Sequence, residues 1–279
     1  MREQFQIQSA EDLPIRGVVD LPEAPRSVVV VVHGFKGFKD WGFFPWVGER
    51  LRGAVAAVVR FDMSRNGIGE RPGELDRLDL FADGSYSTEL ADLGSVLSWV
   101  ASHEILSGLP LFLLGHSRGG GIAILAAAAS PEVRGVITWS AIAKADRWDE
   151  ATKQEWRRSG HLDIPNSRTG QVMRLSTRAL DDLEAAGSQL DILAAAGRLT
   201  VPVLHVHGVA DETVHPTEAE HLASRGKNSS LVLIANGTHT FGAVHPFAGS
   251  SPELRFAMQA SLAFIHAYCR GTRIVNLSR

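Results

Sequence analysis

The chain has 279 residues, of which 44% are hydrophobic and 21% are charged, and its formal net charge at neutral pH is -3. This composition is typical of a globular protein with one large core, or with a core and an insertion. The small net charge offers no basic surface for nucleic acid or for an anionic membrane, so neither is expected as a partner.

The N-terminal segment MREQFQIQSAEDLP lacks the basic region and the apolar stretch of a secretory signal, so a cytoplasmic location is expected. The single cysteine, Cys269, allows no internal disulfide, which agrees with a reducing compartment. The longest apolar neighbourhood runs from Leu109 to Ala129, but His116 and Arg118 interrupt it and argue against a membrane span.

The strand patterns begin with FQIQ and IRGVVDLP, two β-prone segments that predict an antiparallel pair at a sheet edge. RSVVVVVHG then supplies five consecutive valines, Val28 to Val32, a pattern typical of a strand buried on both faces of a parallel sheet. The same pattern recurs in VAAVVRFD, LPLFLLG, VRGVITWS, VPVLHVHG and SLVLIANG.

Helical periodicity fills the gaps between these strands, in FFPWVGERLRGA, SYSTELADLGSVLSWVASH, GGGIAILAAAAS and PTEAEHLASRG. The last helix, SPELRFAMQASLAFIHAYCRG, has Ser250 or Ser251 as its N-cap, Pro252 at its first position and Gly271 beyond its end. Alternating strands and helices predict an α/β fold with a mostly parallel central sheet flanked by helices.

Residues 141–199 break this alternation. They contain no strand-like run but at least two amphipathic helical stretches, and they are too long for a simple crossover. We therefore expect an inserted helical cap at 141–199 and a core formed by 1–140 and 200–279. The charged residues would also suit a plain surface excursion, but Trp148 and Trp156 favour a lid over something apolar.

The candidate nucleophile is Ser117, in the sequence Gly-His-Ser-Arg-Gly between an apolar strand and a helix. The pattern G-x-S-x-G at a strand-to-helix turn presents a serine hydroxyl at the edge of a sheet, and the glycines relieve collisions with neighbouring elements. The N-terminus of the following helix directs its dipole and free N–H groups toward the place where an oxyanion would form.

A serine nucleophile needs a base and an acid that orients the base. Asp211 follows the strand VPVLHVHG and His239 follows SLVLIANG, so both lie at carboxyl ends of strands, where open α/β sheets place their sites. The order Ser117, Asp211, His239 is the one expected for this architecture. The predicted oxyanion donors are the backbone N–H groups of Arg118 and of Phe35, in the loop after the valine strand.

Rival assignments remain open for the acid and for two histidines. Glu212 would replace Asp211 if the strand ended one residue later. His205 and His207 share one strand face and could chelate a metal, but no third ligand recurs at a useful spacing. We therefore expect these histidines to pack below the site, and we expect neither a metal nor a cofactor.

The pocket candidates are aromatic side chains near the expected site: Phe35, Trp139, Trp148 and Trp156. For any single aromatic residue a role in the core is the commoner outcome. The side chain of Arg118 is either a surface cation or the partner of an acid under the cap, and the sequence does not decide between them.

The motifs HGFKG, GHSRGG, HGVADETV and GTHTF resemble those of the α/β-hydrolase superfamily in type and order, over Val28 to Arg270. HGFKGFKDWGFFPWVGERLRGAVAAVVRFDMSRNGIGE is especially similar to the branch that contains dienelactone hydrolases and cinnamoyl or feruloyl esterases. The resemblance implies a serine esterase with a cap inserted after the sixth strand. Dienelactone hydrolases use a cysteine nucleophile, and the serine at position 117 departs from them.

The expected function is hydrolysis of a carboxylic ester of a small or medium molecule through an acyl-enzyme intermediate on Ser117, His239 and Asp211. Thioester or amide cleavage on the same triad, and ligand binding without turnover, are the alternatives. The expected partner is a small-molecule ester, and whether the chain forms a homodimer is left open.

Overall fold

The computed structural model describes residues 1–71, 73–166 and 169–269. Its centre is an eight-stranded sheet in the order β1-β2-β4-β3-β5-β6-β9-β10. The bounds are β1 (Arg2–Gln8), β2 (Pro14–Asp20), β3 (Ser27–Val32), β4 (Ala56–Phe61), β5 (Leu111–His116), β6 (Val133–Trp139), β9 (Val203–Gly208) and β10 (Ser229–Ile234).

The strand directions confirm the predicted α/β class. β1 pairs antiparallel with β2, and β2 pairs antiparallel with β4, whereas all pairs from β4 to β10 are parallel. Every residue of β3, β4, β5 and β9 is buried, because helices cover both faces of the parallel part of the sheet. The predicted antiparallel pair at one edge is confirmed as β1 and β2.

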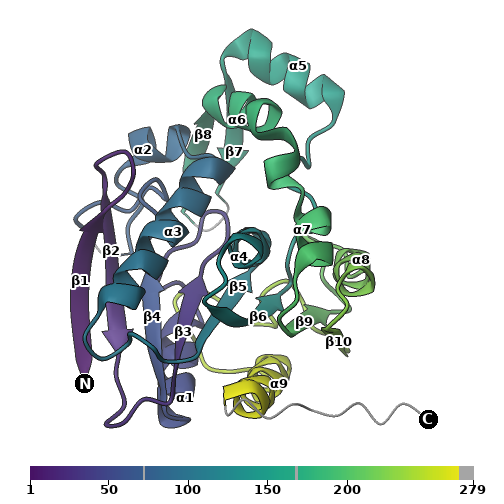
Figure 1. Cartoon of the computed structure of the whole chain (residues 1–279). Coiled ribbons are helices and arrows are strands. Elements are labelled where there is room, and N and C mark those ends of the chain that lie inside the picture. The colour runs from purple at the N-terminus through teal and green to yellow at the C-terminus, as the bar shows by residue number, and fades with distance from the viewer. Residues whose placement is uncertain (72, 167–168, 270–279) are drawn as a thin grey trace.

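Helices cover the sheet in two layers (Figure 1). On one face, α1 (Phe44–Gly53) and α9 (Pro252–Cys269) pack over β3, β5 and β6 in one apolar cluster. On the other face, α3 (Tyr86–Ser102), α4 (Arg118–Ala129) and α8 (Thr217–Arg225) share a second cluster. None of the helices within the described ranges is long and apolar enough to cross a membrane.

The segment expected as a helical cap also contains strands, which corrects the sequence analysis. It comprises α5 (Glu150–Ser159), β7 (His161–Pro165), β8 (Val172–Ser176), α6 (Arg178–Ala186) and the short 3-10 helix η1 (Gly187–Leu190). β7 and β8 form an antiparallel hairpin. The hairpin escaped detection because its apolar residues alternate with charged ones over only five positions in each strand.

The remaining helix of the insertion, α7 (Ile192–Arg198), packs against α4 and α8 as part of the core layer. Its buried residues Ile192, Ala195 and Ala196 belong to the same apolar cluster as α3 and α4. Above this layer, α5, the hairpin and α6 project beyond the sheet (Figure 1). These four elements, α5, β7, β8 and α6 in residues 150–186, form the cap.

A third apolar cluster joins the cap to the core. Trp156 of α5, with Met173 and Leu175 of β8, packs with Phe38 and Phe81 from loops and helices of the core. Trp156 is 0% exposed, and its indole nitrogen donates a hydrogen bond to the Leu175 carbonyl at 3.1 Å. Burial of these side chains stabilises the packing of the cap against the core.

Two smaller features lie at helix ends and beside the cap. The short helix α2 (Leu78–Ala82) was not predicted, and it buries Phe81 against the cap cluster. For α9, the hydroxyl of Ser251 accepts a hydrogen bond from the Leu254 N–H at 2.9 Å, which is N-cap geometry. The predicted helix end at Gly271 lies outside the described residues.

Backbone segments come very close together where β5 turns into α4. A Cβ atom on Gly115 would lie 2.2 Å from the Gly119 carbonyl oxygen. We expect Gly115→Ala to lower the free energy of unfolding by about 3 kcal/mol or more, because backbone atoms must shift to admit a methyl group. Urea unfolding followed by tryptophan fluorescence measures the change.

Gly94→Ala is the matched control, since Gly94 lies inside α3 with nothing within 4 Å of its Cβ position. There the same substitution should raise the free energy of unfolding by about 0.5–1 kcal/mol through the higher helix propensity of alanine. Equal unfolding midpoints for Gly115→Ala and the unmodified protein would contradict the packing argument.

Candidate active site

Ser117 stands at a sharp turn between β5 and α4, with φ 56° and ψ -122°. This left-handed backbone conformation is uncommon for a residue with a side chain and requires support from its surroundings. The support comes from hydrogen bonds: the Ser117 N–H donates to the Trp139 carbonyl at 2.9 Å, and its carbonyl accepts from the N–H groups of Gly120 and Ile142. The end of β6 therefore fixes the turn, and Ser117 remains partly exposed.

Asp211 and His239 come together as predicted from their positions at two strand ends. The Nδ1 atom of His239 lies 2.8 Å from Oδ2 of Asp211. Because a carboxylate only accepts hydrogen bonds, this contact places the proton on Nδ1 and leaves Nε2 as an acceptor when the ring is neutral. Glu212, the rival acid, is exposed.

The Asp211 carboxylate is buried and accepts four hydrogen bonds. The N–H groups of Thr213 and Val214 donate to Oδ1, each at 2.9 Å, while His239 and His207 approach Oδ2. Burial alone would raise the pKa of Asp211, but the hydrogen bonds from His207 and His239 hold the pKa well below its usual range. Asp211 therefore carries a full negative charge at neutral pH.

His207 is a residue of the site that the sequence analysis placed only as packing. Its Nε2 lies 2.8 Å from the Val214 carbonyl and 3.2 Å from Oδ2 of Asp211, so Nε2–H donates toward both acceptors. His205 instead contacts the Thr138 hydroxyl at 2.8 Å. Across the described residues, no group of three or more histidine, cysteine, aspartate or glutamate side chains could hold a metal ion.

His116, next to the serine, supports the loop that carries His239. Its Nε2 lies 2.9 Å from the His239 carbonyl oxygen, which can only accept, so Nε2 carries the proton. Burial, with His239 nearby, lowers the pKa of His116 to about 3. The ring is therefore neutral at pH 7 and brings no positive charge to the site.

The loop after β3 approaches the serine as predicted. A Cβ atom on Gly34 would lie 3.0 Å from the Ser117 Cβ atom, so only glycine allows this approach without displacement. Among the described residues, none accepts a hydrogen bond from the Phe35 N–H. Arg118 is the first residue of α4, and an N–H at that position has no partner within its helix. Both predicted oxyanion donors are thus available.

The Arg118 side chain turns away from the serine into the core. Its guanidinium carbon lies 4.3 Å from the ring centre of Phe35 and 4.3 Å from that of Tyr86. Its NH1 atom lies 3.0 Å from Oε1 of Glu89 in α3. Arg118 thus has an acidic partner, as one of the two options expected, but this partner belongs to α3 and not to the cap. The guanidinium lies between the rings of Phe35 and Tyr86 and so holds Phe35 against the core.

A cavity of about 200 Å³ opens above Ser117. Its described lining residues are Gly34, Phe35, Lys36, Gly37, Trp41, Phe44, His116, Ser117, Asn166, His239 and Thr240. No hydrogen bond joins Ser117 to His239 within the described part of the chain. Catalytic hydrogen bonds are often long without substrate, and the two side chains line the same cavity.

Three of the four aromatic pocket candidates are wrong. Trp139 is 0% exposed, packs with Phe43 and Phe241 below the site, and donates a hydrogen bond to Ser261. Trp148 and Trp156 pack edge to face in the cap cluster, with ring centres 5.2 Å apart, and neither lines the cavity. Only Phe35 does so, together with Trp41, Phe44 and Lys36, which the sequence analysis did not single out.

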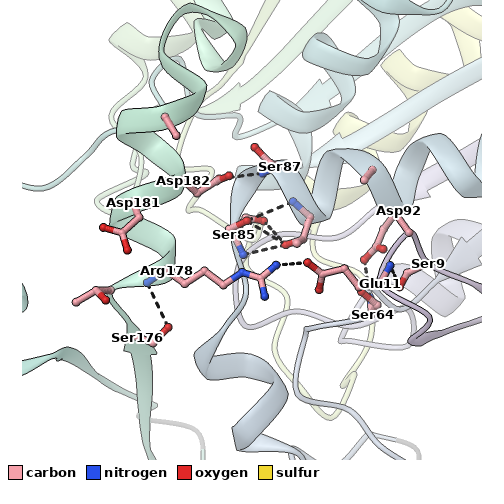
Figure 2. A pocket seen from close by; sticks show the side chains of 15 residues that line it. Ser9, Glu11, Ser64, Ser85, Ser87, Asp92, Ser176, Arg178, Asp181 and Asp182 are labelled. Atoms are coloured by element: carbon pink, nitrogen blue, oxygen red, sulfur yellow. Dashed lines mark hydrogen bonds and ion pairs between the residues drawn. The ribbon is translucent and has the colours of Figure 1, made fainter.

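A separate polar cleft of about 580 Å³ follows the seam between cap and core (Figure 2). Arg178 of the cap extends across it to pair with Glu11, and Asp182 accepts a hydrogen bond from the Ser87 N–H at 3.0 Å. Asp92 lies on the core side, where its carboxylate accepts a hydrogen bond from the Ser64 N–H at 2.7 Å. These polar contacts add to the apolar cluster that packs the cap against the core.

The sheet order and the turn at Ser117 define the chain as an α/β hydrolase. A family model described as "Serine aminopeptidase, S33" matches residues 23–175, and one described as "Serine hydrolase (FSH1)" matches residues 111–249. The first match covers more than half of the chain, so the chain belongs to that family of serine hydrolases.

The curated relatives are partial matches. A putative phosphoribosyl transferase of Mycobacterium tuberculosis is 31% identical over 119 residues, which are 43% of this chain and 25% of that protein. The 2,6-dihydropseudooxynicotine hydrolase of Paenarthrobacter nicotinovorans is 25% identical over 245 residues, which are 82% of this chain and 57% of that protein. The chain thus spans about a quarter of the first relative and little more than half of the second.

Solved structures agree over nearly the whole fold. Est1E from Butyrivibrio proteoclasticus, in a structure with bound ferulic acid, has a TM-score of 0.72 and 21% identity, covering 95% of this chain and 99% of that one. A dienelactone hydrolase from Anabaena variabilis has a TM-score of 0.65 and 19% identity, covering 96% and 98%. At these identities the likeness establishes the fold.

The Arg118–Glu89 pair should contribute to stability because both groups are largely buried, with 9% and 18% of their side chains exposed. We expect Arg118→Met to lower the free energy of unfolding by about 3 kcal/mol, since it leaves the Glu89 carboxylate without its partner. A double-mutant cycle with Glu89→Gln, measured by urea unfolding, should give a coupling energy of about 1 kcal/mol or more. Additive losses would contradict the pairing.

Asp92 should make stability depend on pH. Burial raises its pKa from 3.8 to about 6, so the carboxyl group favours the protonated form in the folded state. The unfolded state loses this proton first, so the free energy of unfolding falls as pH rises from about 4 to about 6, by about 3 kcal/mol in total, and levels off above that range.

Asp92→Asn removes this titration and should unfold at a higher urea concentration than the unmodified protein at pH 8, with no gain at pH 4. Glu23→Gln, at an exposed position, controls for the change in net charge. The same difference at both pH values would contradict the assignment.

Proposed function

We propose that the protein is a serine hydrolase that cleaves carboxylic esters of small or medium molecules. The observation that carries this proposal is the 2.8 Å contact between Asp211 and His239, with His239 and Ser117 lining one cavity. A serine, a histidine and a buried aspartate in this relation activate a hydroxyl group for acyl transfer. The membership of a serine hydrolase family supports the same chemistry.

In the proposed reaction, Nε2 of His239 takes the proton from the Ser117 hydroxyl as Oγ bonds to the ester carbonyl carbon. The carbonyl oxygen gains negative charge and accepts hydrogen bonds from the N–H groups of Phe35 and Arg118. When the C–O bond to the alcohol breaks, His239 donates its proton to the leaving oxygen. A water molecule, deprotonated by His239, then attacks the acyl carbon and releases the acid and the serine.

The size of the cavity favours a small acyl group. A volume of about 200 Å³ lies below the range of roughly 300–1,000 Å³ that drug-sized ligands occupy. The structural likeness to a protein with bound ferulic acid makes a compact aromatic ester a second probe worth testing. The proposed enzyme needs no cofactor for these steps.

The test is hydrolysis of 4-nitrophenyl esters of increasing acyl length, and of methyl ferulate, by the purified protein. We expect turnover that is fastest with short acyl groups. Ser117→Ala and His239→Ala should each lower kcat by about 10³-fold or more, because nucleophile and base act as a unit. Ser98→Ala, which removes a hydroxyl from the exposed side of α3, is the matched control and should keep the wild-type rate.

Asp211→Asn should also lose most activity, while Glu212→Gln, one residue away and exposed, should not. Aminoacyl 4-nitroanilides and acyl thioesters, assayed in parallel, test the amide and thioester alternatives. Labelling of Ser117 by a fluorophosphonate, without turnover of any ester, would favour those classes over ester hydrolysis. Absence of both labelling and turnover would contradict a hydrolytic role and favour ligand binding.

A further inference from the structure

Lys36 brings the one full positive charge among the described residues that line the cavity above Ser117. It directly follows Phe35, whose N–H is a proposed oxyanion donor, and its side chain is partly buried. His116 in the same cavity is neutral at pH 7, because burial lowers its pKa to about 3. None of the described lining residues carries a carboxylate.

Within the described part of the chain, the ammonium group has a polar contact but no countercharge. Its Nζ atom donates to the backbone carbonyl of Pro165, at the end of strand β7 in the cap, at 3.3 Å. Burial lowers the pKa of Lys36, and no neighbouring carboxylate opposes that effect. A partly buried cation without an anion is electrostatically unfavourable, and an anionic group on a ligand would relieve this.

Other partly buried lysines of the chain show the usual arrangement. Lys39, only three residues away, lies 3.0 Å from carboxylate oxygens of both Asp40 and Asp62. Lys153 pairs with Asp146 and Glu150. Among the described residues, the absence of such a partner at Lys36 is therefore a local property of the cavity wall.

We propose that Lys36 binds a carboxylate carried by the substrate, so that this chain prefers esters that bear a free carboxylate group. The inference rests on the proposed ester hydrolysis and adds a substrate class to it. The carboxylate would receive a charge-assisted hydrogen bond from the Lys36 ammonium while the ester carbonyl lies between Phe35 and Arg118. Such a contact fixes the orientation of a small substrate in a small cavity.

The experiment compares charged and neutral esters of matched length. Mono-4-nitrophenyl adipate and 4-nitrophenyl hexanoate differ by a carboxylate on the acyl chain. Carboxymethyl hexanoate and ethyl hexanoate differ by a carboxylate on the alcohol. For each pair, the ratio of kcat/KM for the charged ester to that for the neutral ester is measured in the unmodified protein and in Lys36→Met. Comparing ratios cancels the intrinsic reactivity of each ester and any general damage to the loop.

We expect Lys36→Met to lower the ratio by about tenfold in at least one pair, and the pair that responds shows which side of the ester carries the carboxylate. Lys36→Arg keeps the charge and should retain most of the ratio. Raising the salt concentration from about 0.05 M to about 0.5 M should lower the ratio in the unmodified protein, because salt screens a partly exposed charge pair.

Lys227→Met is the matched control, since it removes a lysine from an exposed turn between α8 and β10. Its ratios should equal those of the unmodified protein. If the protein hydrolyses neutral esters but Lys36→Met leaves the ratios unchanged in both pairs, the assignment of Lys36 is overturned and the proposed function stands. A lowered Tm of Lys36→Met together with unchanged ratios would show that Lys36 only stabilises the contact between core and cap. If the unmodified protein hydrolyses no ester, the proposed function fails and this assignment falls with it.

Discussion

The left-handed backbone at Ser117 is the constraint on which the site depends. Holding a residue with a side chain in this region costs on the order of 1–3 kcal/mol, so the surroundings must enforce it. They do so through the hydrogen bond to Trp139 and through packing so close that a Cβ atom at Gly119 would lie 2.3 Å from two carbonyl oxygens of β3 and its loop. Close packing at this turn therefore requires the glycines, and the turn that they allow leaves the Ser117 hydroxyl partly exposed.

The charges in the site are arranged around His239, the proposed base. The negative charge of Asp211 is buried behind His239 and held by four donors, while His239 lines the same cavity as Ser117. His116 is neutral and only steadies the carbonyl of His239. In the proposed reaction, a proton that moves from Ser117 to His239 generates a cation beside a fixed anion, and this anion stabilises the charge on the histidine.

The sequence predicts the alternating strands and helices, and it predicts the candidate site residues that follow the order expected for this architecture. A run such as Val28 to Val32 predicts a buried strand. Asp211 and His239 each follow a strand, and because these two strands are neighbours their ends bring the two residues together. The hairpin of β7 and β8 was missed because its pattern is short. Trp139 was wrongly expected in the pocket because successive side chains along a strand point to opposite faces. An error of one residue in the strand position therefore moves a side chain from the cavity to the core. Lys36 could not be singled out from the sequence, because its proposed role depends on which charged groups lie near it in the fold.

The cap and the cavity are connected by the same few residues. The loop after β3 contributes Phe35 on one side, where Arg118 holds it to the core, and Lys36 on the other, where it contacts Pro165 of the cap. Asn166, the next cap residue, lines the cavity itself. A substrate anion at Lys36 would thus lie where the cap meets the proposed oxyanion loop, and selection of the substrate and alignment of its carbonyl would depend on one stretch of backbone.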